Sequence, residues 1–178
     1  MAPSPAGADD SAERVVVEQV RPEVTYGLRA EVLRPGLPPI RARFDGDDAP
    51  TALHYAAYDV YDRVVGVVAV LPEPFADDEP GHRLRGMAVR TDRHRSGVGF
   101  ALLRRVFDGV ARLGGGLLWC NARLPAAEFY ERGGFVRVGE TWDEPDLGPH
   151  VRMRRTVTED DLLPSVDLDS IQVWRNQR

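Results

Sequence analysis

The feature that most constrains the fold is a predicted strand, a polar turn with the pattern Gly-x-Gly, and an amphipathic helix, in direct succession. The segment HRLRGMAVR (82–90) predicts the strand, and Gly97 and Gly99 lie where the helix begins. The apolar residues of this helix share one face of a 3.6-residue wheel: Leu103, Val106, Phe107, Val110 and Leu113. Such a helix covers a sheet with its apolar face, so the unit predicts a layered α/β fold.

The rest of the chain predicts further strands and helices around this unit. Apolar and β-branched runs predict strands at 14–20, 51–60, 63–74, 117–120, 135–140 and 150–157. Helical spacing predicts one helix after Pro22 and a short one at about 125–132. The predicted order is β-α-β-β-β-α-β-α-β-β. It describes a mixed, mostly antiparallel central sheet with helices on both faces and one crossover helix between two parallel strands.

Composition divides the chain into one domain and two tails. The 178 residues, of which 43% are hydrophobic, suffice for one compact core. Residues 1–12 are rich in Pro, Ala, Gly and Asp, and we predict a disordered segment there. The predicted domain spans 13–157, and an acidic C-terminal tail follows at 158–178.

The charge pattern excludes several classes of site. All 23 basic residues are arginine, which removes Schiff-base and P-loop lysines. The net charge of −5 disfavours a general nucleic-acid coat. Residues 81–112 nevertheless hold eight arginines and two aspartates, a local balance of +6. This basic stretch indicates either a specific anionic ligand or a solvated helix face, and composition leaves both open.

Cysteine and histidine usage narrows the chemistry further. The single cysteine, Cys120, excludes an internal disulfide framework and fits a reducing compartment, so we expect a cytoplasmic protein with a buried, unreactive thiol. No apolar run approaches the about 20 residues of a membrane span, and the first residues lack the features of a secretory signal. We therefore expect no membrane association. The four histidines show no metal-ligand spacing, and no metal is predicted.

The turn before the long helix is suited to bind a phosphate. A helix N-terminus offers unpaired backbone N–H groups and the positive end of the helix dipole. Gly97 and Gly99 let that backbone approach an anion without a Cβ in the way, and Arg93, His94 and Arg95 add positive charge. A nucleotide P-loop is disfavoured because no Gly-Lys-Ser/Thr follows, and a dinucleotide fold because the turn follows the fourth predicted strand. We predict a diphosphate ligand.

Two segments carry a resemblance to a known family. AVRTDRHRSGVGFALL (88–103) resembles the acyl-CoA pyrophosphate loop of the GNAT superfamily of N-acetyltransferases, whose pattern is Arg/Gln-x-x-Gly-x-Gly/Ala after a strand. His94 stands where the family usually has Arg or Gln. NARLPAAEFYERGGF (121–135) resembles the family's second signature, with Gly133 in place of an apolar residue. The two motifs follow in the family's order, and the resemblance covers about residues 14–157.

This resemblance implies an acetyl-CoA-dependent N-acyltransferase that moves an acetyl group directly to a primary amine of a small molecule or peptide. It assigns CoA binding to the strand end, the glycine turn and two later positions: Met87, Ala88, Val89, His94, Arg95, Ser96, Gly97, Val98, Gly99, Phe100, Asn121 and Phe129. Tyr130 stands where the family places a tyrosine near the CoA sulfur, so it is the expected general acid; a packing role is the alternative. The general base stays open, with His54, Glu73 and a water-mediated base as candidates.

The acceptor is the least determined part. WDEPDLGPHVRM (142–153) resembles a subgroup of small bacterial-type members of the family. That resemblance puts four residues near the acceptor end of the cleft, where they favour an amine or polyamine: Asp143, Glu144, Asp146 and His150. An exposed acidic turn is the alternative reading, and specificity is expected to depend on the loops 35–50, 73–81 and 141–149. A non-catalytic acyl-CoA-binding module of the same fold is the alternative function, and a homodimer remains open.

Overall fold

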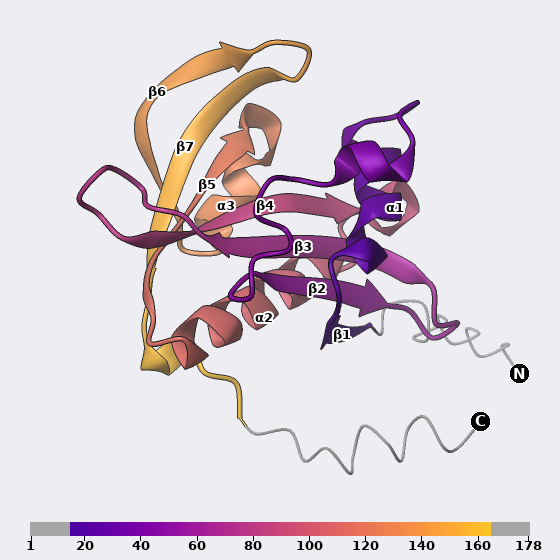
Figure 1. The fold of residues 1–178 in the computed structure, drawn as a ribbon, viewed down its shortest axis with the longest axis horizontal. Helices are drawn as coiled ribbons and strands as arrows, with labels where there is room; N and C mark the ends of the chain where they lie inside the picture. Colours follow the sequence, from indigo (N-terminus) through magenta and orange to yellow (C-terminus); the bar gives the residue numbers. More distant parts are fainter. Residues whose placement is uncertain (1–14, 165–178) are drawn as a thin grey trace, which may run out of the picture.

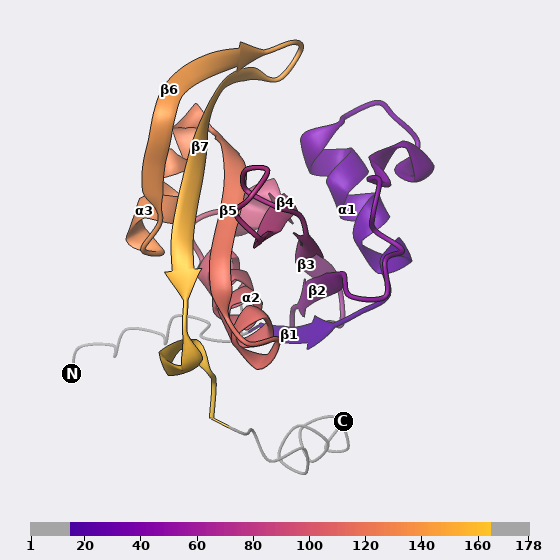
Figure 2. The same ribbon diagram turned by 60° about the vertical axis from the view of Figure 1, so that its left-hand side comes forward.

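The computed structural model describes residues 15–164, which form a seven-stranded sheet with helices on both faces (Figures 1 and 2). The elements follow in the order β-α-β-β-β-α-β-α-β-β, and the strands are arranged β1-β2-β3-β4-β5-β7-β6 across the sheet. Both the element order and the mostly antiparallel α/β fold class are therefore confirmed. The predicted segment 1–12 and the tail after residue 164 lie outside the described residues.

The bounds of the elements are as follows. The strands are β1 (Val16–Gln19), β2 (Leu53–Tyr58), β3 (Val64–Pro72), β4 (Gly81–Val89), β5 (Gly116–Arg123), β6 (Val136–Glu144) and β7 (Gly148–Val157). The helices are α1 (Glu23–Leu33), α2 (Val98–Arg112) and α3 (Ala127–Arg132). Short 3-10 turns occur at η2 (Pro39–Ala42), η3 (Thr91–Arg93), η4 (Leu124–Ala126) and η5 (Glu159–Asp161). Neighbouring strands are antiparallel except β4 and β5, which run parallel because α2 crosses over between them.

Helix α2 forms the main core with one face of the sheet. Its residues Leu102, Leu103, Val106 and Val110 are completely buried. The helix approaches β3 closely at Gly66, where an added Cβ would come within 2.7 Å of Val98 and 2.9 Å of Leu102. The predicted apolar face was wrong at its last position, because α2 ends at Arg112 and leaves Leu113 49% exposed.

Strands β4 and β5 separate part of the way along the sheet. They pair only over Gly81–Arg83 and Leu117–Trp119. Beyond that point β5 stays paired with β7 as far as the pair Arg123 and His150, whereas residues 84–89 of β4 have no partner on the β5 side in the described part of the chain. Strands β4 and β5 thus diverge in the middle of the sheet. Helix α1 packs on β3 and β4, on one side of this separation (Figure 2).

The C-terminal part of the fold is more regular than predicted. Strand β6 continues to Glu144 and β7 begins at Gly148, so most of the expected loop 141–149 is a hairpin. The chain after β7 is also ordered at first, because Thr158 and Asp161 form a capping box around η5. The backbone N–H of Leu163 donates to Asp108 of α2 at 3.0 Å. The start of the predicted tail therefore docks on α2.

Candidate active site

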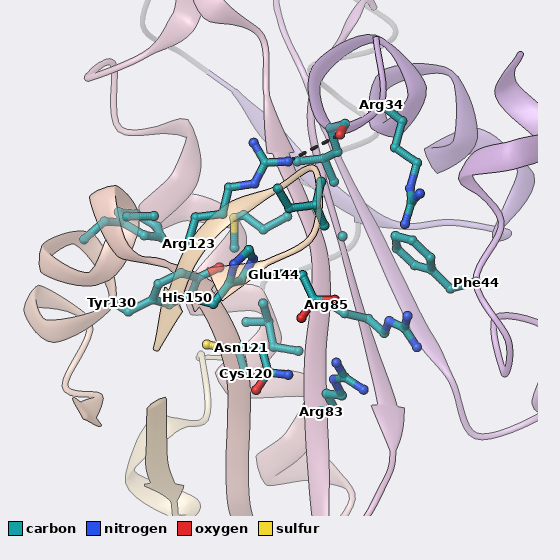
Figure 3. Close-up of a pocket in the computed structure, with 18 residues that line it drawn as sticks. Arg34, Phe44, Arg83, Arg85, Cys120, Asn121, Arg123, Tyr130, Glu144 and His150 are labelled. Carbon is teal, nitrogen blue, oxygen red and sulfur yellow. Dashed lines mark hydrogen bonds between the residues drawn. The ribbon is translucent and has the colours of Figure 1, made fainter. Parts of the chain in front are cut away.

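A cavity of about 380 Å³ lies where β4 and β5 separate (Figure 3). Five parts of the chain form its wall: β4, β5, the segment 126–130 that includes the start of α3, the residues after α1, and the β6–β7 hairpin. Among the predicted site residues, Met87, Asn121, Phe129 and Tyr130 line it. The cavity is thus built from segments up to about a hundred residues apart, which the sheet topology brings together.

The glycine turn before α2 has the geometry that an anion site requires. Gly97 is the N-cap of α2, with φ +86°, and no side chain caps the helix. The first helical hydrogen bond runs from the N–H of Ala101 to the carbonyl of Gly97, so within residues 15–164 the N–H groups of Val98, Gly99 and Phe100 have no hydrogen-bond acceptor. Arg95 also has a positive φ, +63°, an uncommon conformation for a residue with a Cβ. The backbone conformation of the turn therefore leaves these three N–H groups available to an anion at the positive end of the helix dipole.

Gly99 connects this turn to the cavity wall. A Cβ on Gly99 would lie 3.0 and 3.1 Å from two ring carbons of Phe129, so a larger residue would push this ring a few tenths of an ångström away from the helix start. The ring of Phe129 in turn packs edge-on against Phe100 and Tyr130, with centroid distances of 5.0 and 5.1 Å. The ring of Phe129 thus contacts both the predicted turn, at Gly99, and the predicted catalytic residue Tyr130.

The polar side chains of the turn bind mainly to the protein itself. His94 Nε2 lies 3.1 Å from the carbonyl oxygen of Val89, which fastens the turn to the end of β4. Ser96 Oγ donates to the carbonyl of Arg93 at 2.7 Å. The side chain of Arg95 is exposed, and Ala88 is buried within the sheet. Any contribution of this turn to anion binding is therefore made chiefly by its main-chain N–H groups.

The basic stretch 81–112 is largely neutralised in the folded chain. Five of its eight arginines form ion pairs: Arg83 with Glu73, Arg90 with Asp92, Arg93 with Asp59, and both Arg105 and Arg112 with Asp108. The other three, Arg85, Arg95 and Arg104, form no ion pair with any described residue. Arg95 and Arg104 are exposed to solvent, whereas Arg85 is half-buried on the cavity wall.

Tyr130 and Cys120 both line the cavity and lie close enough for Cys120 to affect the ionisation of Tyr130 (Figure 3). Tyr130 is 7% exposed, and burial, with a smaller contribution from Cys120, raises the pKa of its hydroxyl well above the usual value. Burial likewise raises the pKa of Cys120 to about 12. The thiol is therefore protonated and unreactive, as expected, and the tyrosine hydroxyl keeps a proton that it can donate.

Neither of the two expected base candidates reaches the cavity. Glu73 accepts a hydrogen bond from Arg83 at 2.8 Å and lies outside the wall. His54 is 3% exposed beneath the loop 34–52; its Nε2 donates to the carbonyl of Asp47 at 2.9 Å, and its Nδ1 faces Arg29 at 3.4 Å. Burial lowers the pKa of His54, so it is neutral and serves the packing of the loop.

The β6–β7 hairpin contributes two ionisable side chains to the cavity wall. Glu144 and His150 line the cavity, whereas Asp143 and Asp146 are exposed and do not. His150 Nδ1 lies 2.8 Å from the carbonyl of Gly148, and since a carbonyl can only accept, Nδ1 carries the proton. In the neutral ring Nε2 is then a free proton acceptor, without a hydrogen-bond partner in the described part of the chain.

Sequence reasoning missed a buried polar cluster that shapes the cavity. Arg29 of α1 is fully buried and pairs with Asp47 at 2.7 Å, and the Asp47 carboxylate also accepts from the N–H of Phe44 at 2.8 Å. Two guanidinium groups pack over the ring of Phe44, those of Arg29 at 4.6 Å and Arg85 at 4.4 Å. Arg29 within an apolar helix pattern is the one sequence signal of this cluster, because a buried arginine requires a partner.

Residues 15–164 contain neither a metal-binding cluster nor a membrane-spanning helix. No three Cys, His, Asp or Glu side chains between residues 15 and 164 come together in an arrangement that would hold a metal ion. In the same stretch, every helix is too short or too polar to cross a lipid bilayer.

Comparisons with known proteins agree with this geometry. Residues 50–137 match the family model described as the acetyltransferase (GNAT) domain. The uncharacterized N-acetyltransferase YitI of Bacillus subtilis (strain 168) is 28% identical over 144 residues, which cover 79% of this chain and 95% of YitI. Among solved structures, Escherichia coli ElaA matches with a TM-score of 0.66 and 18% identity, over 80% of this chain and 99% of ElaA. An aminoglycoside 6'-N-acetyltransferase complexed with coenzyme A matches with a TM-score of 0.59 and 17% identity, over 85% and 99% of the two chains.

The family match runs from β2 to the start of β6 and includes the glycine turn and the crossover helix α2. The GNAT family uses acetyl-CoA, and the cavity opens at the strand separation next to the turn in which its phosphates are expected. Motif, topology and sequence relatives agree, and residues 50–137 of this chain form a GNAT acetyltransferase domain.

Proposed function

We propose that this protein is an N-acetyltransferase that moves an acetyl group from acetyl-CoA to a primary amine. The observation that carries the proposal is the row of unpaired N–H groups at Val98, Gly99 and Phe100, connected through Phe129 to a cavity that contains Tyr130. One part of the chain binds an anion with its main chain, and the adjoining part holds a protonated hydroxyl. A thioester attached to a diphosphate needs both.

The residues of the turn and of β4 fit a CoA molecule. The helix N-terminus suits the diphosphate, since its amides and dipole favour negative charge. The edge of β4 at Met87 and Val89 has no strand partner on the β5 side and suits the pantetheine arm, which would add to the sheet like another strand. We call the region formed by the glycine turn and this edge the donor end of the cleft. Bound there, acetyl-CoA would supply an activated acetyl thioester.

Two side chains of the cavity suit the proton transfers of the reaction. His150 Nε2 is oriented by the bond from Nδ1 to the carbonyl of Gly148, and we assign it to accept the proton of the acceptor amine. Tyr130 donates a proton to the departing thiolate; burial raises the pKa of its hydroxyl, so the hydroxyl still carries that proton when the thiolate forms. The N–C bond forms as the C–S bond breaks, and both protons are accounted for. Glu144 is the alternative base.

A thiol-release assay with acetyl-CoA over a panel of amines tests this proposal, with acetyl-CoA binding measured in parallel by calorimetry. We expect binding, and release that depends on the amine. The His150→Gln substitution should lower kcat about 100-fold and leave the Kd of acetyl-CoA unchanged, since general acid–base catalysis contributes 10²–10⁴-fold. Binding without release for every amine would favour the non-catalytic acyl-CoA-binding module, and absence of binding would refute the proposal.

A further inference from the structure

Arg85 is an unusual residue for the place it occupies. It is half-buried on the cavity wall, yet its guanidinium makes no hydrogen bond or ion pair with any residue between 15 and 164. A half-buried arginine normally has a carboxylate or carbonyl partner, because it is costly to remove a charge from water without one. The neighbouring Arg83 follows this rule through Glu73.

The position of this guanidinium is fixed from behind. Its Cζ lies 4.4 Å from the centroid of the Phe44 ring, and the Cζ of Arg29 lies over the same ring at 4.6 Å. The buried pair of Arg29 with Asp47, and the bond from the Phe44 N–H to Asp47, hold the ring in place. Stacking uses the face of the guanidinium and leaves its in-plane N–H groups for a ligand. Arg85 is thus a preorganised donor of a forked pair of hydrogen bonds.

The surrounding charge is positive as well. Four arginines and a single glutamate line the cavity: Arg34, Arg83, Arg85, Arg123 and Glu144. Only Arg83 of these arginines forms an ion pair with a described carboxylate. The pKa of the Arg85 guanidinium is lowered, first by burial and then by the charge of Arg83, which indicates an uncompensated positive site. Such a wall repels a polycation and attracts an anion.

CoA itself is poorly placed to supply that anion. Its diphosphate is expected at the start of α2, after the C-terminal end of β4. Arg85 lies four residues before Val89 on the same strand, about 13 Å farther from the turn at the usual rise of a strand. Between them is Gly86, with φ +64°, at an irregularity in the β3–β4 register. The anion at Arg85 therefore belongs to the second substrate.

We propose that the acceptor is an amine that also carries a carboxylate, which Arg85 binds as a forked pair while the amino group faces Glu144 and His150. This inference rests on the proposed acetyl transfer and names the class of acceptor. A carboxylate matches the planar fork of one guanidinium. Glu144 and His150 on the β6–β7 hairpin provide the complementary wall for an ammonium group. The expected polyamine is thereby replaced by a zwitterion, such as an amino acid.

Two matched probes of opposite charge test whether Arg85 binds a carboxylate, without any turnover. The full chain, saturated with CoA, is titrated by calorimetry with glutarate and separately with pentane-1,5-diamine, which have five-carbon chains. We expect glutarate to bind more tightly than the diamine. The Arg85→Gln substitution should weaken glutarate binding at least tenfold, and Arg85→Lys should weaken it less. Arg104→Gln removes an exposed, unpaired arginine of α2 and is the matched control, with no expected change.

A kinetic comparison tests whether a carboxylate on the amine makes it a better acceptor. Amino acids are compared with their neutral amides as acceptors in the thiol-release assay, with phosphoethanolamine as a phosphate-bearing amine. We expect kcat/KM at least tenfold higher for the best amino acid than for its amide, and Arg85→Gln should remove this preference through KM. Tighter diamine binding, unchanged glutarate binding in Arg85→Gln, or a preference for the amide or for phosphoethanolamine would overturn the inference. Turnover of neutral amines alone would leave acetyl transfer standing, whereas no turnover at all would count against the proposed function.

Discussion

The two ends of the cleft are built in different ways. The donor end, around Gly97 and Gly99, offers main-chain N–H groups from one continuous turn. The acceptor end, which we define as Phe44, Arg85, Glu144 and His150, offers side chains from the loop after α1, from β4 and from the β6–β7 hairpin. A main-chain site depends on local backbone conformation, whereas a side-chain site depends on how distant elements pack. The two ends should therefore respond differently to substitution.

The largest expected effect comes from the packing beneath the acceptor end. Asp47→Asn leaves the guanidinium of Arg29 buried without its charge partner and should lower the free energy of unfolding by about 3–5 kcal/mol. Because Asp47 also holds Phe44, the KM of the acceptor should rise while the Kd of acetyl-CoA stays unchanged. Urea denaturation and steady-state kinetics measure these quantities.

The neighbouring Asp48 provides the control for this experiment. It forms only a surface pair with Arg43, so Asp48→Asn should change stability by less than about 1 kcal/mol. Equal effects of the two substitutions would show that the buried cluster does not support the acceptor end.

A second substitution acts on the chemistry between the two ends. Tyr130→Phe removes only the hydroxyl and should lower kcat about 100-fold at saturating substrates, with little change in either binding constant. Tyr61→Phe, at an exposed position in the β2–β3 turn, is the control and should have no effect. A kcat of Tyr130→Phe near that of the unaltered protein would assign Tyr130 to packing alone.

A third comparison acts on the donor end through the backbone. Gly97 and Gly114 both have positive φ and open space where a Cβ would stand, so alanine strains each of them by about 1–2 kcal/mol. Only Gly97→Ala should also weaken acetyl-CoA binding, by about tenfold, because Gly114 lies beyond the other end of α2. Calorimetry on both variants checks this, and equal acetyl-CoA affinities would mean that the turn conformation is not used for binding.

The smallest effect concerns pH. The pKa of His54 is lowered in the folded chain by burial, so the unfolded chain binds a proton more readily below the unperturbed value of 6.5. The stability that neutral His54 contributes is present above that pH and is lost as the pH falls. The melting temperature should therefore decrease from pH 7.5 to 5.5, and less steeply in His54→Gln. Identical slopes would exclude His54 as the titrating group.

The same contrast explains what the sequence could predict. The strand order, the crossover by α2 and the start of α2 at Gly97 depend on periodicity and on local turn chemistry, and these predictions agree with the fold. The end of β6 was wrong because Thr141–Glu144 belong to an edge strand, whose polar, exposed residues resemble a loop.

The acceptor end was only partly foreseen, for a physical reason. Phe44 gains its position from the contact between Arg29 and Asp47, which are 18 residues apart. Arg85 was counted only as one of the eight arginines of the basic stretch 81–112, and nothing local distinguishes it from the paired Arg83. His150 was expected near the acceptor and at the start of a strand, but residues 141–149 before it, most of which belong to the hairpin, were expected to be a loop. Such side-chain sites require the tertiary structure.

We propose above all that the amides at the start of α2 bind the diphosphate of CoA. NMR observes these N–H groups one by one during a titration. The full chain labelled with ¹⁵N is titrated with CoA and, in parallel, with pantetheine, which lacks the phosphates. We expect CoA to shift the N–H resonances of Val98, Gly99 and Phe100 together with those of Met87 and Val89 on β4. Pantetheine should shift only the resonances of Met87 and Val89. Saturation of CoA binding without any shift at Val98–Phe100 would contradict the proposal.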